Sequence, residues 1–171
     1  MTIRPRDSAS AVTIRPVTLD DLDVLLDIYL DTARHHAAID PEVFQVPDPD
    51  AVIVRLRRRI EGRGEFGEYV AAMIGDVMVG SASVDVADQP SPGNMARAVT
   101  TAEFGVSVVE GWRGYGIGRA LIDHLEGWAR DHGIDRMVLT VSAANEGAIR
   151  LYQELGYREY DRMMLKPLVP R

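Results

Sequence analysis

The sequence predicts an α/β fold with one mixed, mostly antiparallel sheet that carries helices on both faces. Two β-rich runs, at 69–74 and 77–86, are separated only by Gly75-Asp76, a dipeptide suited to a two-residue hairpin. Further along, strand, helix and strand patterns alternate between residues 99 and 141, as in a parallel β-α-β unit. A sheet that combines both kinds of pairing needs helices on both faces.

The first elements precede the hairpin. Residues 12–17 alternate as an opening strand, and Thr18 stands three residues before Asp21 in a capping-box arrangement. A helix with an apolar stripe follows, and a proline-punctuated loop at 40–49 leads to a second helix, for which we expect Asp50 to be the cap. The residues expected to face inward are Leu22, Leu25, Leu26, Tyr29, Leu30 and Ala33 in the first helix and Val52, Ile53, Leu56 and Ile60 in the second.

The second half continues from a turn-rich connection at 87–95 into a strand at 99–109. A third helix follows the glycine-rich turn and stops at Gly133, and a strand is expected at 136–141. A helix over NEGAIRLYQEL ends at Gly156, and residues 157–168 have room for one or two short closing strands. The predicted order is therefore β-α-α-β-β-β-α-β-α-β.

Composition narrows the class of protein. The length of 171 residues predicts one domain over 12–171, with 1–11 as a flexible lead. A net charge of −7 disfavours nucleic acid as a partner, and no apolar run approaches the ~20 residues that span a bilayer. The absence of cysteine agrees with a cytoplasmic protein and excludes thiolate chemistry. One basic run, RLRRRIEGR at 55–63, is interpreted as the solvated face of a helix rather than a recognition patch.

The stretch RGYGIG at 113–118 lies between a strand and a helix, where main-chain N–H groups can approach a phosphate. A dinucleotide fold would need G-x-G-x-x-G after the first strand, and neither the pattern nor the place agrees. A nucleotide-hydrolysing loop needs a lysine after its last glycine, and the chain's lysine is at 166. A purely structural glycine turn is the remaining alternative to a cofactor loop.

Three segments in order resemble the GNAT superfamily of N-acetyltransferases. RGYGIG fits the family's Q/R-x-x-G-x-G/A motif for acetyl-CoA, and the helix N145-x-x-A-x-x-L-Y152 with Gly156-Tyr157 resembles a second family signature, with tyrosine in place of phenylalanine. The opening TIRPVTLDDLDVLLDIY is also similar to the usual family entry segment, so the resemblance covers roughly residues 12–168. It implies the GNAT fold and acetyl-CoA as cosubstrate, with no metal.

The resemblance also assigns a cofactor site. The main chain of the turn would hold the pyrophosphate of coenzyme A, through Arg113, Gly114, Tyr115, Gly116, Ile117, Gly118 and Arg119. The pantetheine arm would lie along Val106, Ser107 and Val108 like an added strand, with the Val108 N–H on the thioester oxygen. A bulky residue at Gly116 or Gly118 should then weaken binding more than a change at Tyr115.

The resemblance implies functional roles for Tyr152 and Asn145, and each residue also has a purely structural alternative. Tyr152 corresponds to the general acid that protonates the leaving thiolate, whereas its spacing alone favours a core tyrosine. Asn145 would hold the cofactor arm, and it is also a good helix N-cap.

Glu103 is the candidate general base. An alkylamine with a pKa of about 10.4 is mostly protonated at neutral pH, so a base or a water relay must take its proton. Strand alternation puts Glu103 on the same face as Gly105 and Ser107, where it would border a cleft. The alternative is a structural glutamate paired with an arginine such as Arg97.

These assignments predict an acyltransferase that moves acetyl to a small-molecule or protein amine by direct attack in a ternary complex. Alternatives are a silent CoA-binding sensor or scaffold, and an acyltransferase that uses another acyl-CoA. The short C-terminal segment departs from the family's longer closing strands, so a second copy in a homodimer could complete the acceptor site. His35 and His36, expected after the first helix, are interpreted as helix-end or pocket residues and not as metal ligands.

Overall fold

The fold comes from a computed structural model of the chain, which describes residues 12–62, 67–87, 99–166 and 168. The chain divides into two compact units, Met1–Thr140 and Val141–Arg171, and each is described by itself. The lead expected at 1–11 lies outside the described residues. A single domain over 12–171 stays a prediction.

The first unit contains a five-stranded sheet in the order β1-β2-β3-β4-β5. Its strands are β1 (Val12–Pro16), β2 (Gly67–Ile74), β3 (Val77–Val86), β4 (Thr101–Val108) and β5 (Arg136–Val138). The first three pairs are antiparallel, and β4 pairs with β5 in parallel. The mixed, mostly antiparallel sheet expected from the sequence is therefore confirmed.

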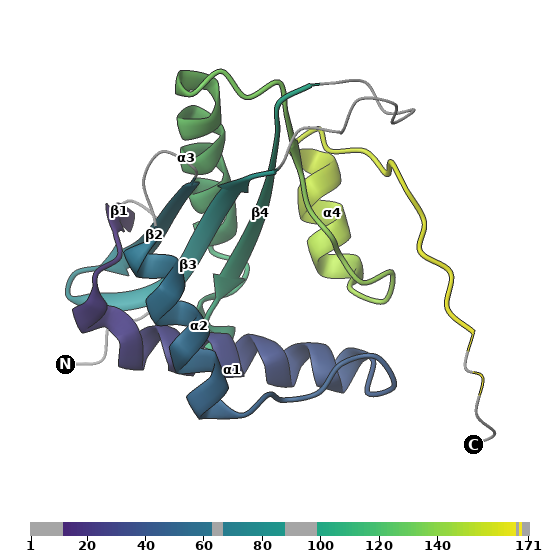
Figure 1. The fold of residues 1–171 in the computed structure, drawn as a ribbon, viewed down its shortest axis with the longest axis horizontal. Helices are drawn as coiled ribbons and strands as arrows, with labels where there is room; N and C mark the ends of the chain where they lie inside the picture. The colour runs from purple at the N-terminus through teal and green to yellow at the C-terminus, as the bar shows by residue number, and fades with distance from the viewer. Residues whose placement is uncertain (1–11, 63–66, 88–98, 167, 169–171) are drawn as a thin grey trace. The chain divides into compact units, whose positions relative to one another are not determined.

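Three helices of this unit cover the sheet on both faces (Figure 1). On one face lie α1 (Leu22–Ile39) and α2 (Pro49–Glu61), and on the other lies α3 (Ile117–Asp131). Short 3-10 turns, η2 (Leu19–Asp21) and η3 (Glu110–Trp112), precede α1 and α3. The second unit contains α4 (Glu146–Glu154).

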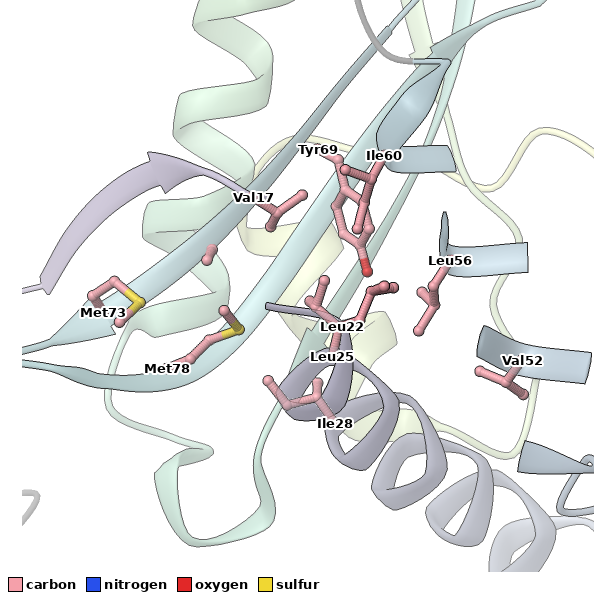
Figure 2. Packing of buried hydrophobic residues seen from close by; sticks show 11 residues of the cluster. Val17, Leu22, Leu25, Ile28, Val52, Leu56, Ile60, Tyr69, Met73 and Met78 are labelled. Atoms are coloured by element: carbon pink, nitrogen blue, oxygen red, sulfur yellow. The ribbon is translucent and has the colours of Figure 1, made fainter. Parts of the chain in front are cut away.

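The core between the sheet and the helices α1 and α2 contains members of both predicted stripes together with Ile28, which lies outside the predicted stripe, while the predicted Leu26 and Tyr29 are only partly buried. Leu22, Leu25 and Ile28 of α1 are buried with Val52, Leu56 and Ile60 of α2 against Val17, Tyr69, Ala71, Met73 and Met78. Figure 2 shows the Tyr69 ring in this cluster, close to Ile60. Burying these side chains supplies the main stabilisation of this face, since each fully buried aliphatic side chain contributes about 1.5–3 kcal/mol.

The core between the sheet and α3 is more completely apolar. Its fully buried members include Val70, Val79, Val84, Ile117, Leu121, Ile122 and Leu125. Gly80 permits the close approach of α3, because a Cβ there would lie 2.8 Å from the Ser107 carbonyl oxygen and 3.5 Å from Ile117 Cγ2. The beginning of α3, which carries the glycine-rich turn, is thereby fixed beside the end of β4.

The helix starts show one confirmed cap and one correction. The Thr18 capping box is present, with the Thr18 N–H donating to Asp21 Oδ2 at 2.7 Å. For α2, Asp50 was the wrong cap: the Asp48 side chain accepts from the Ala51 N–H at 3.0 Å, and Pro49 occupies the first helical position. Proline suits that position because its missing N–H is not needed there.

Three other expectations about elements need correction. The strand expected at 136–141 covers only Arg136–Val138, because its pairing with β4 ends at Glu103. No strand occurs among the described residues of 157–168, so the expected closing strands are absent there. His35 and His36 lie inside α1, in its last turns, rather than after it.

Candidate functional site

The main chain of β4 is unpaired on one side near its end. β5 pairs with β4 only as far as Glu103, and no strand in the described part of the chain continues on that side. On the other side, the Val109 N–H donates to the Val79 carbonyl at 3.0 Å. Because N–H groups alternate in direction along an antiparallel strand, those of Val106 and Val108 point away from β3. This edge can accept an extended ligand.

The glycine-rich turn follows this edge and opens α3. Gly114 and Gly116 have φ values of 81° and 80°, in the left-handed region that favours glycine. Gly116 is the N-cap of α3 and accepts the Ala120 N–H at 3.0 Å, whereas Gly118 lies within the first turn of the helix. The first N–H groups of a helix have no intrahelical acceptor and carry partial positive charge, so this turn suits an anion.

Arg113 connects the turn to two other elements. Its Nε donates to the Val108 carbonyl at 2.9 Å, and its Nη2 forms an ion pair with Asp31 of α1 at 3.0 Å. The guanidinium therefore holds the turn against the end of β4. Asp31 is a positioning residue that sequence reasoning missed, because a pair 82 residues apart leaves no local pattern.

The face of the sheet toward α1 and α2 becomes polar along β3 and β4. Pairing places Ser83 opposite Gly105 and Asp85 opposite Glu103, and Ser81 opposite Ser107. Glu103 is exposed, and it makes no hydrogen bond or ion pair with the described residues. Its expected alternative partner, Arg97, lies outside them. The alternation S-x-S-x-D in β3, matched by E-x-G-x-S in β4, is the sequence signal that marks this polar face.

Arginines of α2 lie above this polar face. Arg59 forms an ion pair with Asp85 and lies 5.9 Å from the centre of the Tyr69 ring. Arg55 donates to the Tyr29 hydroxyl at 2.9 Å. A cavity of about 380 Å³ is lined by Arg55, Arg58, Arg59, Tyr69 and Asp85, among others. Desolvation lowers the pKa of Arg59 from its ordinary value, and burial raises that of Tyr69.

The second unit carries the other two predicted site residues on α4. Asn145 is the N-cap, and its side-chain oxygen accepts from the Ala148 N–H at 3.2 Å, so the simpler role considered for it is present. Tyr152 lies on the last turns of α4, with its ring 6.0 Å from that of Tyr157 in an edge arrangement. Burial raises the pKa of the Tyr152 phenol above its ordinary value.

The histidines of α1 are half-buried and belong to an aromatic contact. The His36 ring lies 5.1 Å from that of Phe44, and burial lowers the pKa of His36, helped by the charges of His35 and Arg113. Within the described residues, no group of three or more histidine and acidic side chains could hold a metal ion. No helix there has the length and apolar character needed to cross a membrane.

An unpaired strand edge followed by a glycine-rich helix start is the arrangement that the sequence motif implied, and comparison with known proteins agrees. Residues 25–157 match the Acetyltransferase (GNAT) family. The chain belongs to this family. A GNAT relative, the L-amino acid N-acetyltransferase AaaT of Escherichia coli K12, is 31% identical over 156 residues, which cover 86% of this chain and 83% of that protein. The ribosomal protein bS18-alanine N-acetyltransferase of the same organism is 38% identical over 56 residues, 33% of this chain and 38% of that protein.

Solved structures share the GNAT fold of this chain. The BH1408 protein of Bacillus halodurans, solved as a tetramutant, has a TM-score of 0.82 at 22% identity, over 91% of this chain and 99% of that chain. The aminoglycoside N-acetyltransferase AAC(6′)-Iy, solved in complex with CoA, has a TM-score of 0.66 at 19% identity, over 91% and 93% of the two chains.

Proposed function

We propose that this protein is an N-acetyltransferase that moves acetyl from acetyl-CoA to a primary amine by direct attack in a ternary complex. The observation that carries the proposal is the open edge of β4 beside the glycine-rich start of α3, tied together by Arg113. An open strand edge suits an extended, amide-containing chain, and a helix N-terminus suits a phosphate. Coenzyme A contains both groups: an extended chain with amides and, further along the same molecule, a pyrophosphate.

Cofactor binding would use main chain more than side chains. The N–H groups from Gly114 to Arg119 would hold the pyrophosphate, and the edge from Val106 to Val108 would pair with the pantetheine amides. The outward direction of the Val106 and Val108 N–H groups supports either as the donor to the thioester oxygen. The Val108 carbonyl accepts from Arg113 Nε, which orients the peptide between Val108 and Val109 at the end of this edge.

The reaction conserves atoms without a covalent enzyme intermediate. The amine nitrogen attacks the thioester carbonyl carbon, the C–S bond breaks, and an amide and the thiol of CoA result. The ammonium form of the acceptor first loses one proton, which ends in solvent, so that the neutral nitrogen can attack. A second proton, matched by the one that the nitrogen loses as the amide forms, reaches the departing sulfur. We assign removal of the first to Glu103, directly or through water, and donation of the second to Tyr152. The chain has no cysteine that could carry the acyl group instead.

The position of Glu103 supports its role as a base that acts over a distance. Adjacent residues of a strand are about 3.3 Å apart, so Glu103 lies about 10 Å along β4 from Val106 and about 17 Å from Val108. If the Val106 N–H donates to the thioester oxygen, a single water molecule could carry the proton from the amine to Glu103. A donor at Val108 would require a longer relay.

The relatives support an amine acceptor, because their names record acetylation of amino acids and of a protein's alanine. The test is an assay of purified protein with acetyl-CoA and a panel of L-amino acids, peptides, polyamines and aminoglycosides. Release of CoA thiol together with an acceptor heavier by one acetyl group is the expected result. Tight acetyl-CoA binding without transfer to any acceptor would favour a silent CoA-binding protein, and faster transfer from a longer acyl-CoA would favour a different acyl donor.

A further inference from the structure

We propose that the arginine face of α2, defined as Arg55, Arg58 and Arg59, binds a carboxylate of the acceptor, so that the acceptor is a carboxylate-bearing amine. This inference rests on the proposed function and deepens it. The three arginines share one side of α2 because residues three and four apart on a helix are neighbours. All three line the same cavity of about 380 Å³. Arg57, on a different side of the helix, does not line it.

The charge around this cavity is unbalanced in favour of an anion. Asp85 is committed to Arg59. The carboxylate of Glu68, which also lines the cavity, is engaged by His124 of α3 at 3.1 Å. Arg55 donates to the neutral hydroxyl of Tyr29, and Arg58 has no ion-pair partner among the described residues. Among the described residues, two guanidiniums thus line the cavity without a carboxylate partner, in a chain whose net charge is −7.

Like charges three and four residues apart on a helix repel each other and lower its stability, and a bound anion would relieve that repulsion. Two aromatic rings order the guanidiniums: Arg55 lies 5.4 Å from the centre of the Tyr29 ring, and Arg59 lies over Tyr69. A planar guanidinium held in this way can bind a carboxylate by donating two parallel hydrogen bonds to it. The face is therefore partly preorganised for a carboxylate.

The arginine face lies next to the candidate base. Asp85, the partner of Arg59, is directly opposite Glu103 across the β3–β4 pair, and the charge of Glu103 acts on Arg59. An acceptor whose carboxylate binds Arg55 and Arg58 would therefore have its amine on the Glu103 side of the same sheet face. A free amino acid has both groups on one small molecule. An aminoglycoside or a polyamine, being cationic throughout, would be repelled.

The test compares each L-amino acid with its own carboxamide, which keeps the amine and side chain and removes the negative charge. We expect the wild-type enzyme to acetylate the acids with a kcat/KM at least about tenfold above that of the amides. The double variant R55Q/R58Q should lose this preference, mainly through KM for the acid, with little change for the amide. The two amines differ in basicity, and comparing the acid-to-amide ratio between variants cancels that difference.

Arg57→Gln is the matched control, since it removes an exposed guanidinium from the same helix without touching the cavity. It should keep the wild-type preference, and R55K/R58K should keep part of it. Equal acid-to-amide ratios in the wild type, R55Q/R58Q and R57Q would overturn the inference.

A calorimetric titration of the same acids and amides onto the CoA-loaded protein separates this inference from the proposed function. If no amine is acetylated but the acid binds and R55Q/R58Q abolishes that binding, the proposed function fails, and only the carboxylate site on the arginine face stands. If neither acid nor amide binds and none is acetylated, both fail.

Discussion

The charged side chains at this sheet fall into two kinds: Arg113 and Asp85 form ion pairs, and Glu103 does not do so with the described residues. Arg113 and Asp85 are each committed to a partner, and those partners hold the turn and α2 in place. Glu103 is exposed and makes no such contact with the described residues. Glu103 lies opposite Asp85, which lines the cavity, and a carboxylate there with no partner among the described residues is a candidate for chemistry rather than stability.

Replacing Glu103 by glutamine tests its role as the base. Glutamine keeps the shape and cannot accept the proton, so kcat/KM at pH 7 should fall by roughly 10². The deficit should shrink as pH rises toward about 10, because the free amine then becomes abundant without help. The pH profile of acetyl transfer measures both effects. A variant that equals the wild type across this range would show that another group or water alone removes the proton.

Replacing Tyr152 by phenylalanine tests the proposed acid. Because burial raises the pKa of Tyr152 above its ordinary value, the phenol stays protonated throughout the neutral range. We therefore expect the variant to lose roughly 10²-fold in kcat with acetyl-CoA affinity retained. In the wild type, no loss of activity across the neutral range should come from this group. Tyr157→Phe, which changes its ring neighbour, is the control, and equal effects of the two variants would argue against an acid role for Tyr152.

Asp21 predicts a different kind of pH effect, on stability. The Arg15 guanidinium, hydrogen-bonded at 2.7 and 2.8 Å, lowers the pKa of Asp21 to about 2. Because the folded pKa lies below the ordinary value, this stabilisation is complete above about pH 4 and is lost as pH falls through about 2. Arg15 is 41% exposed, so solvent screens the pair.

We expect Asp21→Asn to lower the free energy of unfolding by about 1 to 2 kcal/mol at pH 7, from the lost ion pair and cap. The difference from the wild type should narrow between about pH 4 and pH 2. Denaturant titrations at a series of pH values measure it, with Asp20→Asn, an exposed neighbour, as control. An undiminished difference at pH 2 would contradict the ion pair as its source.

At the scale of elements, the glycine-rich turn contains one glycine that its backbone conformation requires and one that only the approach of a ligand would require. Gly116 has a left-handed φ, whereas Gly118 lies inside the right-handed first turn of α3. Alanine at Gly118 is therefore compatible with the helix and adds about 0.5–1 kcal/mol of helix propensity. If a pyrophosphate lies against this turn, the same methyl group should weaken acetyl-CoA binding. Stability and affinity would then change in opposite directions.

Gly116→Ala should lower both stability and affinity. Gly75→Ala is its matched control, because Gly75 has a φ of 57° in the β2–β3 hairpin and a Cβ there meets nothing within 4 Å. The two variants should lose comparable stability, and only Gly116→Ala should also lose acetyl-CoA affinity. Thermal unfolding and calorimetric binding give the two quantities. Normal affinity in both Gly116→Ala and Gly118→Ala would argue for a purely structural turn.

The sequence predicted the elements whose signals are local. Apolar stripes and capping residues located α1, α3 and α4, and Gly75-Asp76 located the hairpin. The prediction failed at the strand expected over 136–141, which stops at Val138, where its pairing with β4 ends. The apolar run does not indicate the position at which that pairing ends. Ion pairs across the fold, such as Arg113 with Asp31, leave no sequence pattern at all.

At the scale of the whole molecule, charge is distributed unevenly. A chain with a net charge of −7 concentrates three arginines on one side of α2, above a polar sheet face. The basic run was interpreted from sequence as a solvated helix face. That interpretation holds for Arg55, Arg57 and Arg58, which are exposed, whereas Arg59 is half-buried and engaged with Asp85. The register that places Asp85 beside α2 could not be derived from the run itself.

The family and the fold follow from features spread along most of the chain. The proposed chemistry depends on a single event, the binding of acetyl-CoA at the open edge of β4. Calorimetric titration of the purified protein with acetyl-CoA, CoA and propionyl-CoA, beside Gly116→Trp, tests that dependence most directly. We predict micromolar binding of acetyl-CoA to the wild type, and its loss in the variant. Absence of binding of all three ligands to a folded wild-type protein would contradict the proposed site and the acetyl transfer built on it.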